Sequence, residues 1–341
     1  MALFAPIKNW FVLNTFGVAL NAFIKKRSLT LLEKKELDRL LTQLEAGVAL
    51  QRARAKHQSE PHPESPHCAE AIVFSKDRAL QLHALLSSFQ ELLTPPIPIH
   101  VLYYASTPEH GKAYKDVKTL FPTVRFIAQS SGAFRDDLLN IFPTITAQRL
   151  FFLVDDIVFT GKTDLQEFCQ YDTDAYVPSL RMGKNITRSY TMQQDLSVPP
   201  LREETDHLFW QWEKGVHDWG YPLSVDGHIF ATWEIAAITQ LVSFKAPNSY
   251  EDALQLFKPF FACRAGIASP KSRLVNIACN KVQGEVDNIH GEMHQDFLLE
   301  QWQKGLQMDY HALAGFQNDA PHADIPLHFI PRVRQNGENN V

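Results

Sequence analysis

Two groups of polar residues stand directly after apolar runs, where side chains able to do chemistry are often placed. Asp155 and Asp156 follow the run RLFFLV at 149–154, and the tetrapeptide SKDR at 75–78 closes an earlier run. Neighbouring carboxylates repel each other unless a cation neutralises them. Carboxylate oxygens are hard ligands that favour Mg²⁺ or Mn²⁺. We therefore expect the acid pair to hold a divalent metal; the alternative is an Asp that caps the next turn beside a solvated one.

The elements that must position these groups follow an alternating pattern. Short apolar runs predict buried strands, and apolar residues at helical spacing predict the helices between them. The strands are expected at 71–76, 99–104, 124–128 and 149–154, and the first two helices at 80–93 and 108–120. This alternation predicts an α/β fold, a Rossmann-type mostly parallel sheet flanked by helices. Ligands bind such sheets at the carboxyl ends of the strands, where both polar groups fall.

Two common phosphate-binding motifs are excluded by the letters of the sequence. Gly161, Lys162 and Thr163 resemble the end of a P-loop, but that motif requires glycine at the position of Asp156. The three residues also follow the acid pair instead of preceding it by a strand and a helix. No GxGxxG is present, so the dinucleotide fingerprint is missing too.

Taken together, SKDRALQL and, 78 positions after Asp77, FLVDDIVF resemble the nucleotide-sugar glycosyltransferases of the GT-A fold, family-2-like, over roughly residues 70–290. The resemblance implies that the acid pair is a DxD-type motif. Asp156 would then bind the metal, and Asp155 would contact the metal shell or the donor ribose. The turn after the first strand would touch the nucleotide through the residues Ser75, Asp77 and Arg78.

The same resemblance implies an acceptor side. Inverting members carry an E-D pair at a helix start, and NSYED at 248–252 matches it. Asp252 would be the general base, with Glu251 beside it; the alternative is ordinary acidity at a helix N-terminus, which the helix dipole favours. A late histidine often touches the metal in this family, and His290 is the candidate.

Further residues are candidates by type. Arg181 and Lys184 are expected to stabilise donor phosphates, unless they are ordinary surface charges. The aromatic-rich segment 207–233 suits sugar rings, because indole faces combine apolar area with a polar edge. Trp219, Asp226 and Trp233 are the expected acceptor contacts, and the alternative is that the rings belong to the core.

The chain divides into an N-terminal helical extension at 1–56, a Pro- and His-containing linker at 57–68, a catalytic domain at 69–310 and a C-terminal tail at 311–341. The apolar run at 10–24 is shorter than the roughly 20 residues that span a bilayer. Residues 1–27 therefore predict either a helix docked on the protein or one lying at a membrane surface, with its basic cluster facing anionic lipid.

Composition sets the remaining limits. The 341 residues are 45% hydrophobic with a net charge of -5, which excludes a disordered chain and gives no reason to expect nucleic acid as a partner. The 4 cysteines lack metal-ligand spacing and indicate a reducing, cytoplasmic setting, with peripheral membrane contact as an option. We expect a glycosyltransferase of polysaccharide biosynthesis that uses Mn²⁺ or Mg²⁺, a nucleoside-diphosphate sugar donor and a glycan or lipid-linked acceptor. Two alternatives remain: an inactive sugar- or nucleotide-binding module, and a nucleotidyltransferase.

Overall fold

The computed structural model describes residues 31–61, 64–130, 132–278 and 295–332, and it separates into two compact units, Met1–Ala49 and Leu50–Val341. The described part of the first unit is helical and belongs to α2 (Leu31–Ser59), which continues into the second unit. The segment predicted as a linker therefore begins inside a helix. No helix in these described ranges is long and apolar enough to cross a membrane. Residues 1–27 lie outside them.

The second unit is built on a five-stranded sheet with the order β13-β5-β1-β3-β4, in which only β13 runs antiparallel. In this sheet Phe74 pairs with Leu102 on one side and with Val154 on the other. The carboxyl ends of three neighbouring strands therefore meet at one edge. The strands are β1 (Glu70–Lys76), β3 (Ile99–Tyr104), β4 (Arg125–Ala128), β5 (Arg149–Val154) and β13 (Ile229–Ala231).

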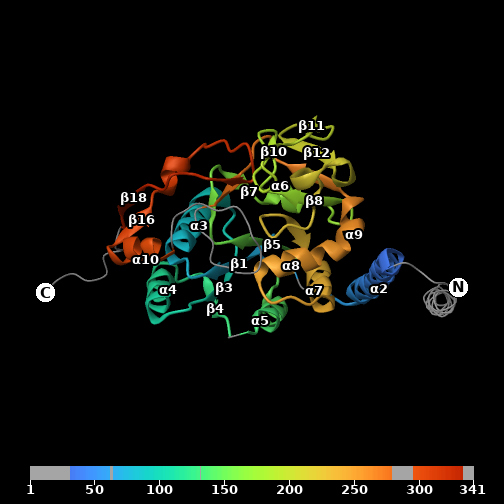
Figure 1. Cartoon of the computed structure of the whole chain (residues 1–341), viewed down its shortest axis with the longest axis horizontal. Helices are drawn as coiled ribbons and strands as arrows, with labels where there is room; N and C mark the ends of the chain where they lie inside the picture. Colours follow the sequence, from blue (N-terminus) through green and yellow to red (C-terminus); the bar gives the residue numbers. More distant parts are fainter. Residues whose placement is uncertain (1–30, 62–63, 131, 279–294, 333–341) are drawn as a thin grey trace. The chain divides into compact units, whose positions relative to one another are not determined.

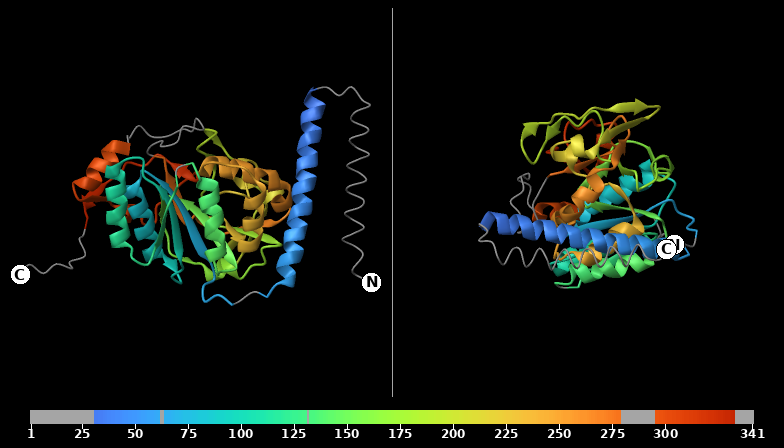
Figure 2. Two further views of the ribbon diagram at one scale, coloured as in Figure 1. Left: turned by 90° about the horizontal axis from the view of Figure 1, so that it is seen from below. Right: turned by 90° about the vertical axis from the view of Figure 1, so that its right-hand side faces the viewer.

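Burial explains why the sequence predicts these strands. Every residue of β1 from Glu70 to Ser75 is buried, because helices cover both faces of the sheet. Strands of that kind read as continuous apolar runs. Figures 1 and 2 show α3, α4 and α10 on one face and α5, α7 and α8 on the other. The predicted α/β fold with a mainly parallel, helix-flanked sheet is confirmed. The helices are α3 (Ala79–Leu92), α4 (Pro108–Leu120), α5 (Phe134–Ile141), α7 (Thr232–Leu241), α8 (Pro247–Leu254) and α10 (Gln295–Gln303).

Smaller sheets extend the carboxyl-end edge. One has the order β11-β12-β14-β8 and the other the order β17-β15-β6. Because β6 begins one residue after Asp156, the second of these sheets lies beside the acid pair. Its outer strand β17 comes from the predicted tail, whose described part thus joins the folded unit. The strands are β6 (Ile157–Phe159), β8 (Tyr176–Ser179), β11 (Arg202–Glu204), β12 (His207–Gln211), β14 (Ala265–Ala268), β15 (Leu274–Ile277) and β17 (His322–Ala323).

The remaining elements are short and connect these layers. Two-residue pairings join β2 to β7 and β9 to β10, while β16 pairs with β18. Two short helices, α6 and α9, precede β8 and β14 of the four-stranded sheet in the sequence. The bounds are β2 (Leu93–Thr94), β7 (Thr163–Asp164), α6 (Gln166–Cys169), β9 (Arg188–Ser189), β10 (Gln194–Asp195), α9 (Lys258–Ala262), β16 (Leu306–Met308) and β18 (Phe329–Pro331).

Candidate active site

The turn after β1 is held by contacts inside the protein. The hydroxyls of Ser75 and Tyr114 are 2.6 Å apart. Asp77 has φ +56°, a left-handed conformation that aspartate adopts more readily than most residues. Its Oδ1 accepts a hydrogen bond from the backbone N–H of Ser106 at 2.7 Å. Asp77 therefore braces the end of β1 against the loop after β3.

The acid pair at the end of β5 is bridged by a guanidinium. Nη1 of Arg78 lies 3.0 Å from Oδ1 of Asp155 and 3.0 Å from Oδ2 of Asp156. The other oxygen of Asp155 accepts the backbone N–H of Lys76 at 3.0 Å. Burial raises the pKa of Asp155 to about 6, while Arg78 acts in the opposite direction. Arg78 therefore supplies part of the positive charge that two neighbouring carboxylates need.

Asp155 and Asp156 differ in how many of their carboxylate oxygens accept hydrogen bonds. Both oxygens of Asp155 are used, whereas Oδ1 of Asp156 is buried with no hydrogen-bond partner among the described residues. That orphan oxygen fits one bond to a divalent cation. In the described ranges no group of three or more His, Cys, Asp or Glu could hold a metal by itself. A cation here would need substrate phosphates and water as its other ligands, as Mg²⁺ commonly does.

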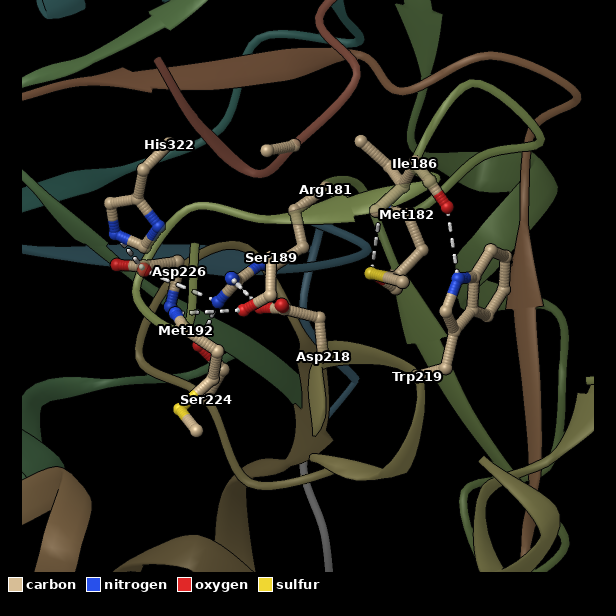
Figure 3. A network of polar contacts seen from close by, with 12 residues as sticks. Arg181, Met182, Ile186, Ser189, Met192, Asp218, Trp219, Ser224, Asp226 and His322 are labelled. Atoms are coloured by element: carbon tan, nitrogen blue, oxygen red, sulfur yellow. Dashed lines mark hydrogen bonds and ion pairs between the residues drawn. The ribbon is translucent and has the colours of Figure 1, made fainter. Parts of the chain in front are cut away.

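A second polar cluster surrounds Arg181 (Figure 3). This buried guanidinium donates to Oγ of Ser224 at 2.6 Å and to Oδ2 of Asp226 at 3.3 Å through Nη1. Through Nη2 it donates to Oδ1 of Asp218 at 3.0 Å. Hydrogen bonds to ionised partners are about twice as strong as neutral ones. Arg181 therefore fixes two carboxylates from one loop region in defined positions.

Of the predicted E-D pair, only Glu251 joins this cluster. Its Oε1 accepts the backbone N–H of Val225 at 3.1 Å, and Asp252 is exposed. Burial, reinforced by the charge of Asp226, raises the pKa of Glu251 to about 7. A carboxyl that titrates near neutral pH is suited to exchange protons at the pH of the cell.

A backbone hydrogen bond and a histidine connect the two clusters. The backbone N–H of Gly227, next to Asp226, donates to the carbonyl of Phe152 at 2.8 Å, which sets this loop beside the end of β5. His322 on β17 has its Nε2 3.9 Å from Oδ2 of Asp226. Burial and Arg181 lower the pKa of His322, and the charges of Asp226 and Asp156 oppose that lowering. His322 therefore lies within the electrostatic reach of both clusters.

His322 and Asp218 are two candidate site residues that the sequence analysis did not predict. His322 lies on a strand of two residues in a Pro-rich segment, where no periodicity exists to reveal a strand. Asp218 lies in a 3-10 turn and reaches Arg181 from 37 positions away. Only the histidine type itself, in a segment otherwise poor in chemistry, could have served as a signal.

Several predicted site residues lie elsewhere. Trp219, predicted as an acceptor contact, has a fully buried ring, and its indole N–H donates to the carbonyl of Ile186 at 3.0 Å. Trp233 stacks on His57, with 5.0 Å between the ring centroids. Lys184 is exposed and paired with Glu203. His290 lies outside the described residues.

Comparisons with known proteins give one clear relative. No family model matches the chain. The bifunctional glycosyltransferase pgtA of Dictyostelium discoideum is 27% identical over 255 residues, which are 64% of this chain and 32% of that protein. The chain thus spans about a third of the length of this relative. The similarity confirms the resemblance to glycosyltransferases inferred from the sequence.

Solved structures resemble part of the chain. S. aureus TarS 1-349 in complex with UDP-GlcNAc is 15% identical, with a TM-score of 0.43, and the match covers 64% of this chain and 59% of that one. The mannosyltransferase PcManGT from Pyrobaculum calidifontis, in complex with GDP-Man and Mn²⁺, is 15% identical with a TM-score of 0.28 over 46% of this chain and 48% of that one.

Proposed function

We propose that this chain transfers a sugar from a nucleoside-diphosphate donor to a hydroxyl group, with inversion at the sugar carbon. The observation that carries the proposal is the meeting of two clusters at the carboxyl ends of the sheet. One holds the acid pair with an orphan oxygen on Asp156, and the other holds a carboxyl, Glu251, that titrates near neutral pH. The similarity to a glycosyltransferase over 255 residues supports the same conclusion.

The donor side is assigned to the first cluster. Asp156 would hold a divalent cation, Mn²⁺ or Mg²⁺, through Oδ1, and Asp155 and Arg78 would keep its carboxylate in place. The cation, when bound, supplies charge that stabilises the departing diphosphate. Ser75 and Asp77 shape the turn against which the nucleotide would lie. The Nη atoms of Arg181 are engaged by Ser224, Asp226 and Asp218, so we assign Arg181 to orienting the acceptor side.

The acceptor side needs a base, and Glu251 is the better placed member of the E-D pair. Its carboxyl is fixed by the Val225 N–H and faces the Asp226 loop, whereas Asp252 lies on the exposed side of α8. In the reaction the acceptor oxygen forms a bond to the sugar carbon as the bond to the diphosphate breaks. The acceptor proton passes to Glu251, and the diphosphate leaves with the electron pair. General-base help of this kind contributes about 10²- to 10⁴-fold in rate.

Donor binding is the direct test. We expect UDP-GlcNAc, another UDP-sugar or GDP-mannose, each with Mn²⁺, to raise the melting temperature of the full chain, and Asp156→Asn to abolish that rise. Asp164→Asn is the matched control, because Asp164 is exposed and lies in the same region of the chain. If no nucleotide sugar in the panel shifts the wild-type melting temperature, the proposal fails.

The reaction products distinguish the proposed glycosyltransferase from two other possible functions. An inactive binding module would bind a donor without ever releasing nucleoside diphosphate from it. A nucleotidyltransferase would release pyrophosphate from a nucleoside triphosphate and ignore nucleotide sugars. The proposed glycosyltransferase slowly hydrolyses its donor, and Glu251→Gln lowers that rate while leaving donor affinity intact.

The proposal extends to the acceptor and to the location of the protein. A glycan or a lipid-linked sugar fits the role in polysaccharide synthesis inferred from the sequence. Residues 1–27 would then hold the protein at the inner face of the membrane. Flotation with anionic liposomes, comparing the full chain with a form lacking residues 1–27, tests this; equal flotation of the two would refute it.

A further inference from the structure

Asp218 stands at the rim of the Arg181 cluster. Its side chain is 18% exposed, against 7% for Asp226 and 5% for Arg181. Oδ1 accepts the hydrogen bond from Nη2 of Arg181, and no described residue donates to Oδ2. Asp218 is therefore partly exposed while one of its carboxylate oxygens is anchored to Arg181, and Figure 3 shows the anchoring contact.

Arg181, which anchors Asp218, uses only some of its N–H groups in hydrogen bonds within the protein. Arg181 is buried, and its Nη atoms hold three oxygen acceptors. Its Nε–H is also buried and lacks a hydrogen-bond partner in the described part of the chain. A buried donor without a partner costs free energy, which is expected where a bound molecule or an ordered water completes the site. The orientation of Asp218 is thus set before any ligand arrives.

Apolar surface borders this carboxylate. Met192, in the turn between β9 and β10, is 53% exposed, and Val216, two residues before Asp218, is 47% exposed. A contact of 2.7 Å between the side-chain nitrogens of Gln194 and His217 ties the β9–β10 turn to the segment that carries Asp218. An anchored charged acceptor and exposed apolar side chains therefore occur together.

We propose that Asp218 binds neighbouring hydroxyl groups of an acceptor sugar, with Met192 and Val216 against the C–H face of its ring. A sugar offers both features at once, hydroxyl donors along its edge and apolar C–H groups on its face. A second metal ion is not favoured, because no group of three or more His, Cys, Asp or Glu in the described ranges could hold one here. The inference rests on the proposed function and names the ligand of its acceptor side, a neutral sugar with adjacent free hydroxyls.

The test measures binding of simple sugars. The full chain, loaded with UDP and Mn²⁺, is titrated with the methyl glycosides of galactose, glucose, mannose and N-acetylglucosamine and followed by saturation-transfer NMR. We expect at least one glycoside to bind, and Asp218→Asn to weaken that binding by about 10- to 100-fold, the loss expected for hydrogen bonds to a charged group. UDP affinity is expected to stay unchanged.

Two further variants keep the result interpretable. Asp195→Asn removes an exposed carboxylate from β10, outside the cluster, and should leave glycoside binding unchanged. Met192→Ala removes apolar contact without touching Arg181, and should weaken binding by about 3-fold or more. The inference is overturned if wild-type protein binds UDP but no glycoside, if Asp218→Asn binds glycosides as well as wild type does, or if it loses UDP in parallel. Absence of any nucleotide binding to wild type would instead refute the proposed function.

Discussion

Nη1 of Arg78 and Oδ1 of Asp155 lie 3.0 Å apart, although 77 positions separate them in the chain. The contact joins the turn after β1 to the turn after β5, the central pair of strands in the sheet. Asp155 is buried, and so is most of the Arg78 side chain. The ion pair therefore fixes the geometry of the candidate donor site. Its loss should lower both the free energy of unfolding and the affinity for the donor.

Arg78→Met should lower the free energy of unfolding by roughly 3–5 kcal/mol, because it leaves buried carboxylates without their cation. Urea denaturation at pH 7 measures the change. Arg188→Met, at an exposed position, should stay within about 0.5 kcal/mol of wild type. Adding Asp155→Asn to Arg78→Met should restore part of the loss; no recovery would argue that the pair is not the source of the effect.

The raised pKa of Glu251 predicts a pH-dependent stability. The folded state keeps the proton up to about pH 7, while the unfolded state releases it near pH 4.5. Stability from this residue is therefore complete below pH 4.5 and falls as the pH rises to about 7, by up to about 3 kcal/mol. Glu251→Gln should remove that fall. Denaturation curves of both proteins between pH 4 and pH 8 make the comparison, and parallel pH profiles would contradict it.

The same residue predicts the pH profile of turnover. A base must be ionised to accept a proton, so kcat/KM for donor hydrolysis should rise with pH and level off above about pH 7. In Glu251→Gln the rise of kcat/KM with pH should vanish, together with most of the rate. Asp252→Asn, at the next position in the chain, is the matched variant. If Asp252→Asn abolishes the rise with pH and Glu251→Gln does not, the base is Asp252.

Burial of Trp219 predicts a purely structural effect. Trp219→Ala should cost about 3–5 kcal/mol, because it opens a cavity and removes the hydrogen bond to Ile186. Donor affinity, measured at a temperature where the variant is folded, should match wild type. A selective loss of acceptor binding with unchanged stability would restore the original prediction of a sugar contact.

Gly227 predicts a coupled loss of stability and function. Its φ is +77°, and an added Cβ would lie 2.8 Å from Cδ2 of Leu274. Gly227→Ala should therefore destabilise the fold by about 1–3 kcal/mol and displace the neighbouring Asp226. Thermal denaturation and UDP binding follow the two effects. Gly111→Ala, where an added Cβ meets nothing within 4 Å, is the control.

The central sheet and half of the candidate site could be predicted from the sequence alone. The runs at 71–76, 99–104 and 149–154 lie on strands buried from both faces, so their letters are mostly apolar, and the buried His100 inside the second run contacts Glu70 at 2.6 Å. A strand that ends in a buried parallel sheet must place its next residues at the ligand edge. That rule was sufficient to single out Asp155, Asp156 and the turn 75–78.

The other half was decided by tertiary structure. Arg181 meets Asp218 and Asp226 across 37 and 45 positions, through loops whose course no periodicity encodes. His322 reaches the site because β17 adds to β15, a pairing of two residues that leaves no pattern in the letters. The placement of Trp219 in the core, and of Glu251 instead of Asp252 beside Asp226, depends on which face of an element packs inward. Local sequence fixes what a residue can do; the long-range packing of the chain decides what lies within reach of it.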